Sequence, residues 1–207
     1  MPNEKQRELA DRIELVKPHE AAGEVKEIFE DIRRTKGDRY LTPTWGFFAH
    51  DPELLRLWWG LTKRLQIADG EVPQKYRNAI SLICARDADC PRCINNHQNH
   101  LIDHFNMDLE EVEEILDFEN SDRVPEDLKA VLTFARKVAF SEETTIEDLL
   151  ALRRHGYGNR AIVEIASMAF LESSMARRAV GIAKFEDGEL WPKENVPSEA
   201  YHQNVHA

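Results

Sequence analysis

The sequence predicts an all-α protein, and three observations support this prediction. Apolar residues recur at intervals of three and four along most of the 207 residues, which is the spacing of helices with one buried face. Proline and aspartate stand where such helices would begin. No segment shows the alternation of apolar and polar residues that is typical of a half-buried strand. A chain of this length buries roughly 70% of its unfolded surface, so we expect one ordinary domain.

The first expected helix covers residues 20–34, and Lys36-Gly37 ends it. The apolar residues of its buried face are Ala21, Val25, Ile28, Phe29 and Ile32. A loop containing Pro43 is expected next. Asp51-Pro52 then opens a second helix that runs through Leu65 to Asp69-Gly70, because aspartate and proline suit the N-cap and the first turn.

The third expected helix begins at Pro73 and continues through Cys84, and the acidic segment 87–89 interrupts the pattern. Further helices are expected over residues 91–105, 108–116, 128–140, 145–155 and 159–183. Asp108 supplies an N-cap for one of them, and Pro125 marks a new start for another.

These helices define a domain of residues 12–187, with an N-terminal extension over 1–11 and a polar tail over 188–207. The formal net charge is −11 and the pI is near 5.2, so we expect no nucleic-acid partner. No stretch approaches the ~20 apolar residues of a membrane span, and no apolar run follows the first charged residues. We therefore expect a cytoplasmic protein without a membrane partner.

The segment Cys90-Pro-Arg-Cys93-Ile-Asn-Asn-His97 concentrates the reactive side chains. On a helix Cys93 and His97 share a face, near enough for the imidazole to take the thiol proton, while Cys90 falls at the first turn. A Cys-x-x-Cys pair cycles between dithiol and disulfide or holds a metal. The residues leave both interpretations open, but three cysteines do not make a secreted disulfide framework.

The order of a Val-Pro pair, an arginine, an apolar helix and Cys-x-x-Cys-x-x-x-His resembles the AhpD-like superfamily, also called the carboxymuconolactone decarboxylase family. Four further parts of the chain are similar to its peroxidase-related (alkylhydroperoxidase) branch: Lys17 to Glu30, His50-Asp-Pro-Glu-Leu-Leu, Leu132-Thr-Phe-Ala-Arg-Lys and the arginine-containing last helix. The resemblance covers roughly residues 12–184. It implies an orthogonal bundle of helices that forms a homo-oligomer.

The resemblance also implies a role for each residue of the motif. Cys93 matches the thiol that attacks a hydroperoxide, Cys90 the thiol that resolves the sulfenic acid, and His97 the imidazole that helps to ionise Cys93. The expected activity is that of a cysteine-based oxidoreductase with a redox-active disulfide and no bound cofactor. Its expected partners are a hydroperoxide substrate and a dithiol or thioredoxin-like reductant.

One position departs from the family pattern. The family places a glutamate of its proton relay twelve residues before the first cysteine, where this chain has Asn78 after Arg77. An amide does not carry a proton, so loss of the carboxylate would cost something like the 10²–10⁴-fold that a general acid or base supplies. Glu172, in an apolar stretch of the last helix, is a substitute from another part of the chain, and Glu164 is an equal candidate.

Arg92 stands where the family usually has an aromatic residue. A guanidinium there would favour the thiolate and an anionic substrate. An exposed arginine without such a role is the plainer interpretation.

A zinc site is the first alternative. Cys93, His97, His100 and His104 are spaced four, three and four, so one helix face carries all of them, and Cys90 adds a further ligand. Structural zinc usually draws its ligands from two separated segments, whereas here all would come from one helix and its start.

Two other functions remain. One is a non-catalytic helical oligomer with a degenerate site, which Asn78 favours. The other is a decarboxylase-type lyase, which the intact cysteine pair argues against, because that branch of the family typically lacks it.

Overall fold

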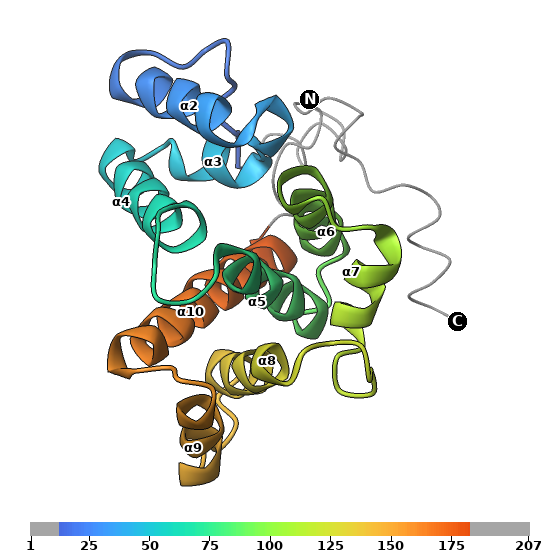
Figure 1. Cartoon of the computed structure of the whole chain (residues 1–207). Coiled ribbons are helices and arrows are strands. Elements are labelled where there is room, and N and C mark those ends of the chain that lie inside the picture. Colours follow the sequence, from blue (N-terminus) through green and yellow to red (C-terminus); the bar gives the residue numbers. More distant parts are fainter. Residues whose placement is uncertain (1–12, 183–207) are drawn as a thin grey trace, which may run out of the picture. The chain divides into compact units, whose positions relative to one another are not determined.

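A computed structural model describes residues 13–182, and these residues form two compact units. The first comprises residues 13–61 and 178–182, and the second comprises residues 62–177. The expected extension over residues 1–11 and tail over 188–207 lie outside the described part of the chain. Figure 1 shows the order of the helices, and no strand occurs between residues 13 and 182. The all-α prediction is confirmed.

The first unit contains short helical segments from the N-terminal part of the chain. They are α2 (Gly23–Lys36), the 3₁₀ turn η1 (Asp38–Tyr40), α3 (Pro43–Phe48) and most of α4 (Pro52–Thr62). Gly37, with φ 101°, ends α2 in a conformation that favours glycine. The expected loop around Pro43 is wrong, because Pro43 occupies the first turn of α3, where its missing N–H is not needed.

The second unit contains the remaining helices and holds all the candidate site residues. Its elements are the π-helical turn η2 (Lys63–Ile67), α5 (Gln74–Asp87), α6 (Pro91–Phe105), α7 (Leu109–Leu116), α8 (Glu126–Ala139), α9 (Ile146–Arg154) and α10 (Asn159–Ile182) as far as Arg177. The second helix, expected to run to Asp69-Gly70, is α-helical only to Thr62 and continues as a π turn that the sequence did not predict.

Helix α5 is the centre of the second unit. It packs against η2, α6, α7 and α8, and every residue from Arg77 to Ala85 is buried. A helix that is apolar nearly all round its circumference is expected in such a position. Figure 1 shows α10 running beside α5, and the Cys84 sulfur lies 3.9 Å from the Ala169 carbonyl of α10.

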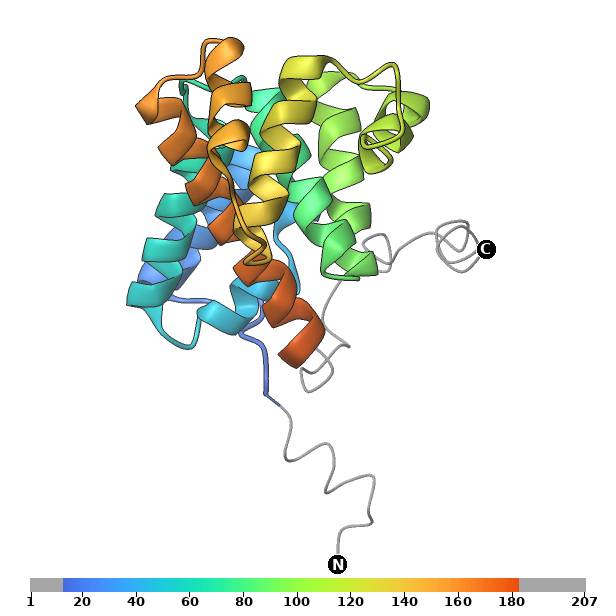
Figure 2. The same cartoon turned by 90° about the horizontal axis from the view of Figure 1, so that it is seen from below.

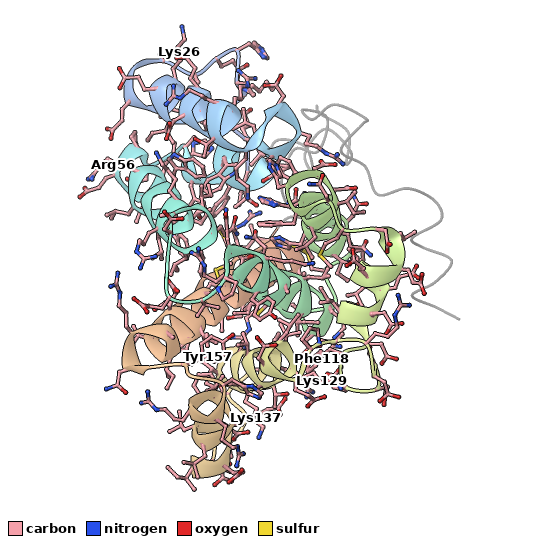
Figure 3. The ribbon with its side chains drawn as sticks, viewed as in Figure 1. Lys26, Arg56, Phe118, Lys129, Lys137 and Tyr157 are labelled. Atoms are coloured by element: carbon pink, nitrogen blue, oxygen red, sulfur yellow. A yellow bond between two sulfur atoms is a disulfide. The ribbon has the colours of Figure 1, made fainter. Side chains whose placement is uncertain are left out.

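The helix boundaries of the second unit follow from local chemistry. Asp108 and Glu111 form a capping box at the start of α7, and Thr145 and Asp148 form another at α9. Helices α8 and α9 lie side by side (Figure 2). Lys137, labelled in Figure 3, crosses between them and donates to Asp148 Oδ1 at 2.7 Å. No helix in residues 13–182 is both long and apolar enough to cross a membrane.

Candidate active site

Cys90 and Cys93 lie at the amino end of α6 and form a disulfide, with their Cα atoms 5.3 Å apart. Cys90 is the N-cap residue, Pro91 is the first helical residue, and Cys93 lies in the first turn. The left-handed residue Asp89, with φ 49°, separates them from α5. The first turn of a helix presents unpaired N–H groups and the positive end of the helix dipole, so this location favours a thiolate in the reduced protein.

The two cysteines differ in accessibility. Cys90 is buried, with 3% of its surface exposed, whereas Cys93 is partly exposed. Solvent and small molecules therefore reach Cys93 more easily than Cys90. The more accessible of the two thiols, Cys93, is the one that the family resemblance predicts to attack a hydroperoxide.

His97 follows one turn after Cys93 on α6, and a carboxylate from another helix pairs with it. Glu172 Oε2 of α10 lies 3.2 Å from His97 Nε2. Both residues are buried, at 9% exposure for His97 and 3% for Glu172. A carboxylate in this position orients the imidazole, which is a role of the third group in a nucleophile–histidine–acid arrangement.

The structure distinguishes the two glutamates that the sequence left equal. Glu164 accepts from the Arg64 guanidinium (2.9 Å) and from the Val72 main-chain N–H (2.9 Å), so it holds the loop before α5. Glu172 pairs with His97. Of the two, Glu172 is the one at the site.

Asn78 is buried on α5, with 1% exposure, and its side chain acts as a donor. Its Nδ2 donates to the main-chain carbonyls of Gln74 (2.9 Å) and Gln66 (3.1 Å). The structure therefore connects Asn78 to the π turn through the Gln66 main chain.

Gln66 is a member of the site that sequence reasoning missed. Its side-chain amide donates to Glu172 Oε1, while the other carboxylate oxygen faces His97. The residue is 4% exposed and lies in η2. A polar amide between Leu65 and Ile67, at the end of an apolar helix, is the sequence signal that was available.

Arg92 is exposed between the two cysteines, in agreement with the plainer interpretation of this residue. Its exposure also leaves the guanidinium available to a molecule that approaches Cys93.

Cys84, the third cysteine, lies fully buried on α5. Burial raises the pKa of its thiol well above the usual value, and the negative charge of Glu172 raises it further. Cys84 is therefore a protonated thiol of the core at neutral pH.

The zinc alternative receives no support from the geometry. Across residues 13–182, no group of three or more His, Cys, Asp or Glu side chains is arranged to hold a metal ion. His100 is buried at 3% exposure, and its ring lies 4.4 Å from the His104 ring and 6.0 Å from that of Phe105. The two histidine rings therefore lie against each other, one buried and one exposed.

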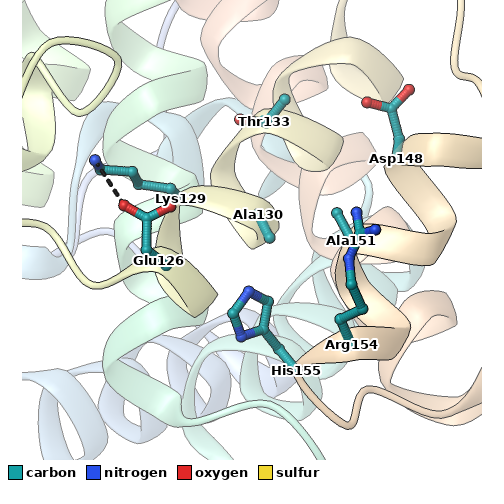
Figure 4. Close-up of a pocket in the computed structure, with 8 residues that line it drawn as sticks. All are labelled: Glu126, Lys129, Ala130, Thr133, Asp148, Ala151, Arg154 and His155. Atoms are coloured by element: carbon teal, nitrogen blue, oxygen red, sulfur yellow. Dashed lines mark ion pairs between the residues drawn. The ribbon is translucent and has the colours of Figure 1, made fainter.

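A cavity of about 380 Å³ lies between α8 and α9, away from the cysteines (Figure 4). Ala130 and Ala151 line it together with charged side chains of both signs. One of these is Lys129, which pairs with Glu126 at 3.0 Å. None of the sequence-predicted site residues lines it.

No protein-family model matches the chain, and no curated protein matches it. Solved structures do match. An uncharacterised peroxidase-related protein from Ralstonia eutropha JMP134, described as an alkylhydroperoxidase AhpD core, superposes with a TM-score of 0.71 at 21% identity and covers 90% of this chain and 97% of its own. A peroxidase-related protein from Silicibacter sp. TM1040 gives 0.69 at 20% identity, covering 81% of this chain and 86% of its own.

The debrominase Bmp8 also matches, with a TM-score of 0.68 at 20% identity, covering 81% of this chain and 88% of its own. A cysteine-to-alanine variant of that debrominase has been solved with 2,3,4-tribromopyrrole. Proteins of one architecture thus include peroxidase-related proteins and a debrominase, so the shared architecture does not select a reaction. This chain has the AhpD-like all-α fold.

Proposed function

We propose that this protein is a thiol-dependent hydroperoxide reductase in which Cys93 is the nucleophile, Cys90 the resolving thiol and His97 the base. One observation carries the proposal: a partly exposed Cys93, bonded to a buried Cys90, stands one helical turn from a buried His97–Glu172 pair. The combination supplies a nucleophile, a proton acceptor and a second thiol within the first two turns of one helix.

The reaction balances without a bound cofactor. The Cys93 thiol loses its proton to His97, and the thiolate attacks the terminal peroxide oxygen, so that the O–O bond breaks and the alkoxide leaves as an alcohol with that proton. Cys93 becomes a sulfenic acid. The Cys90 thiol then condenses with it, forming the disulfide and releasing water. A dithiol of the thioredoxin-like class returns two electrons and two protons, and is itself oxidised.

The roles of the individual groups follow from their energies. A helix amino terminus contributes about 0.3–1 kcal/mol to a thiolate, less than one pKa unit, so His97 has to supply most of the activation. Glu172 stabilises the imidazolium that forms when His97 takes the thiol proton. In this arrangement Glu172 replaces the relay carboxylate that the family places at position 78.

Self-association is the expected quaternary arrangement. Leu54, Leu57 and Leu61 recur along α4 and are each more than 40% exposed, which is unusual for leucines on one helix face. Such a stripe supports burial against a further copy of the chain. Sedimentation of the reduced protein over a range of concentrations measures this directly, and a monomer at every concentration would contradict it.

A brominated aromatic ring is the second substrate class to test, because the fold is shared with a debrominase. A thiol pair next to an acid–base pair is a suitable reductant for either kind of electrophile. The two substrates are therefore compared in the same experiment.

The test is the intact mass and free-thiol count of reduced, metal-stripped protein after one equivalent of an alkyl hydroperoxide, and in parallel after the tribromopyrrole. The proposal expects loss of two hydrogens and two thiols with the hydroperoxide, and no such loss in Cys93→Ser. Oxidation by the bromopyrrole alone would favour the second substrate class. Persistence of both thiols with both compounds would favour a non-catalytic oligomer, a zinc-clipped oligomer or a lyase, and zinc content after purification identifies the clip.

A further inference from the structure

Asn78, the residue that departs from the family pattern, is surrounded by hydrogen-bond acceptors that its amide N–H groups satisfy. Asn78 Nδ2 donates to two main-chain carbonyls, those of Gln74 and Gln66. A carboxylate has no N–H and would face both of these oxygens as an acceptor. Asn78 Oδ1 is buried and has no hydrogen-bond partner within the described residues, so the donated bonds are what this side chain contributes.

The π turn that Asn78 contacts is fixed from the same helix by Arg77. This arginine is 1% exposed, and its guanidinium donates to the carbonyls of Leu65 and Ala68 (2.6 Å for Ala68). A π turn leaves main-chain carbonyls without their usual partners, and such turns recur at functional sites. Arg77 and Asn78 together provide the donors that hold it.

The side chain presented by this turn is Gln66. Its amide donates to Glu172 Oε1, and Glu172 Oε2 faces His97. An uninterrupted series of contacts thus runs from Asn78 through the Gln66 main chain, the Gln66 side chain and Glu172 to His97.

We propose that Gln66 and Asn78 are positioning residues, which hold the Glu172 carboxylate against His97. The effect of this positioning on turnover rests on the proposed function. The amide at position 78 is then an adaptation to a relay carboxylate supplied by α10, and restoring the family glutamate does not improve the site. Asn78→Glu instead places a negative charge against two carbonyl oxygens and releases the turn that carries Gln66.

The effect of removing the Gln66 amide follows from its contact. The amide donates to Glu172 Oε1 while Oε2 faces His97, so its removal frees the carboxylate to turn away from the imidazole. Among the described titratable groups, His97 of α6 lies 3.2 Å from Glu172, and the Cys84 thiol of α5 is near enough for the charge of Glu172 to act on it. In Gln66→Leu we expect turnover to fall by roughly tenfold and its pH profile to change, because a hydrogen bond to a charged group is lost.

The experiment compares wild type, Gln66→Leu, Asn78→Glu and Glu172→Gln in two measurements: the pH profile of hydroperoxide consumption, and the NMR titration of the His97 imidazole. Asn120→Glu is the matched control, because Asn120 is exposed in a turn and receives the same charge. Thermal unfolding of each variant reports whether the fold is retained.

The proposal expects Gln66→Leu and Asn78→Glu to move the His97 titration toward that of Glu172→Gln, while Asn120→Glu follows wild type. It is overturned if Asn78→Glu consumes peroxide faster than wild type, or if Gln66→Leu retains both the wild-type pH profile and the wild-type His97 titration. If wild type consumes no peroxide, the proposed function fails, and the His97 titrations still decide the positioning role.

Discussion

Glu172 Oε2 lies 3.2 Å from His97 Nε2, so that α10 supplies a carboxylate to the imidazole that follows the cysteine pair on α6. This contact joins residues that are far apart in the sequence and buries both side chains. It defines the acid–base half of the candidate site.

Glu172→Gln should remove the charge of this pair while keeping the shape of the side chain. We expect hydroperoxide turnover to fall by about 10²–10⁴-fold, the range that a general acid or base supplies. Stopped-flow measurement of peroxide loss in the presence of a thiol reductant tests this expected fall in turnover. Glu164→Gln is the control, since Glu164 is equally buried on α10 but pairs with Arg64, and equal losses in both variants would argue against a specific role for Glu172.

The two cysteines should give different products when each is replaced. In Cys90→Ser, the partly exposed Cys93 still attacks peroxide once, and its sulfenic acid accumulates because no neighbouring thiol condenses with it. In Cys93→Ser, peroxide loss falls to the background rate. Dimedone labelling followed by mass spectrometry distinguishes them, with Cys84→Ala as the control that should behave like wild type. Dimedone labelling of Cys90 in Cys93→Ser would show that Cys90, and not Cys93, is the attacking thiol.

Cys84 should resist alkylation in the folded protein. Burial, reinforced by Glu172, raises the pKa of its thiol, so it stays protonated at pH 8, where an ordinary thiol is partly ionised. Reduced native protein treated with iodoacetamide at this pH should carry label on Cys93 and none on Cys84, whereas denatured protein should carry label on all three cysteines. Rapid labelling of Cys84 before denaturation would contradict the structure.

Stability should fall between pH 10 and pH 12. Burial, with help from the charge and hydrogen bond of Asp127, raises the pKa of Tyr76 to about 12, and burial raises that of Tyr157 to about 12. Between pH 10 and pH 12, tyrosines of the unfolded chain lose protons that Tyr76 and Tyr157 retain in the folded chain. The free energy of unfolding therefore decreases as pH rises. Urea denaturation at pH 8 and pH 10.5 measures the change. Tyr76→Phe should show a smaller decrease in the free energy of unfolding than wild type. An equal decrease in the two proteins would show that Tyr76 does not cause the effect.

Gly70→Ala should destabilise the second unit. A Cβ at position 70 would overlap the Glu164 carboxylate, which is held by Arg64 and by the Val72 N–H. We expect a loss of about 1–3 kcal/mol in the free energy of unfolding, typical of overpacking. Gly60→Ala is the opposite control, because that position is helical and has nothing within 4 Å. It should gain about 0.5–1 kcal/mol from helix propensity. Equal urea midpoints for the two variants would contradict the close approach.

Most helices could be predicted because their apolar periodicity and start signals are local. The π turn could not, since the donors that hold it come from Arg77 and Asn78, on the next helix. Helix α3 was missed for a different reason: six residues are too short to show a helical period.

The site was predictable where it depends on one helix. The four-residue interval between Cys93 and His97 places them on one face of any helix. The choice between Glu164 and Glu172 was not predictable, because eight residues differ by only about 80° around a helix. Both glutamates therefore fit the same sequence pattern, and only the placement of α10 against its neighbours separates them.

Because α10 supplies the carboxylate, a pattern search that demands a glutamate twelve residues ahead of Cys90 would classify this chain as inactive. A search in three dimensions, for an imidazole–carboxylate pair behind a Cys-x-x-Cys helix start, would retain it whichever helix provides the acid.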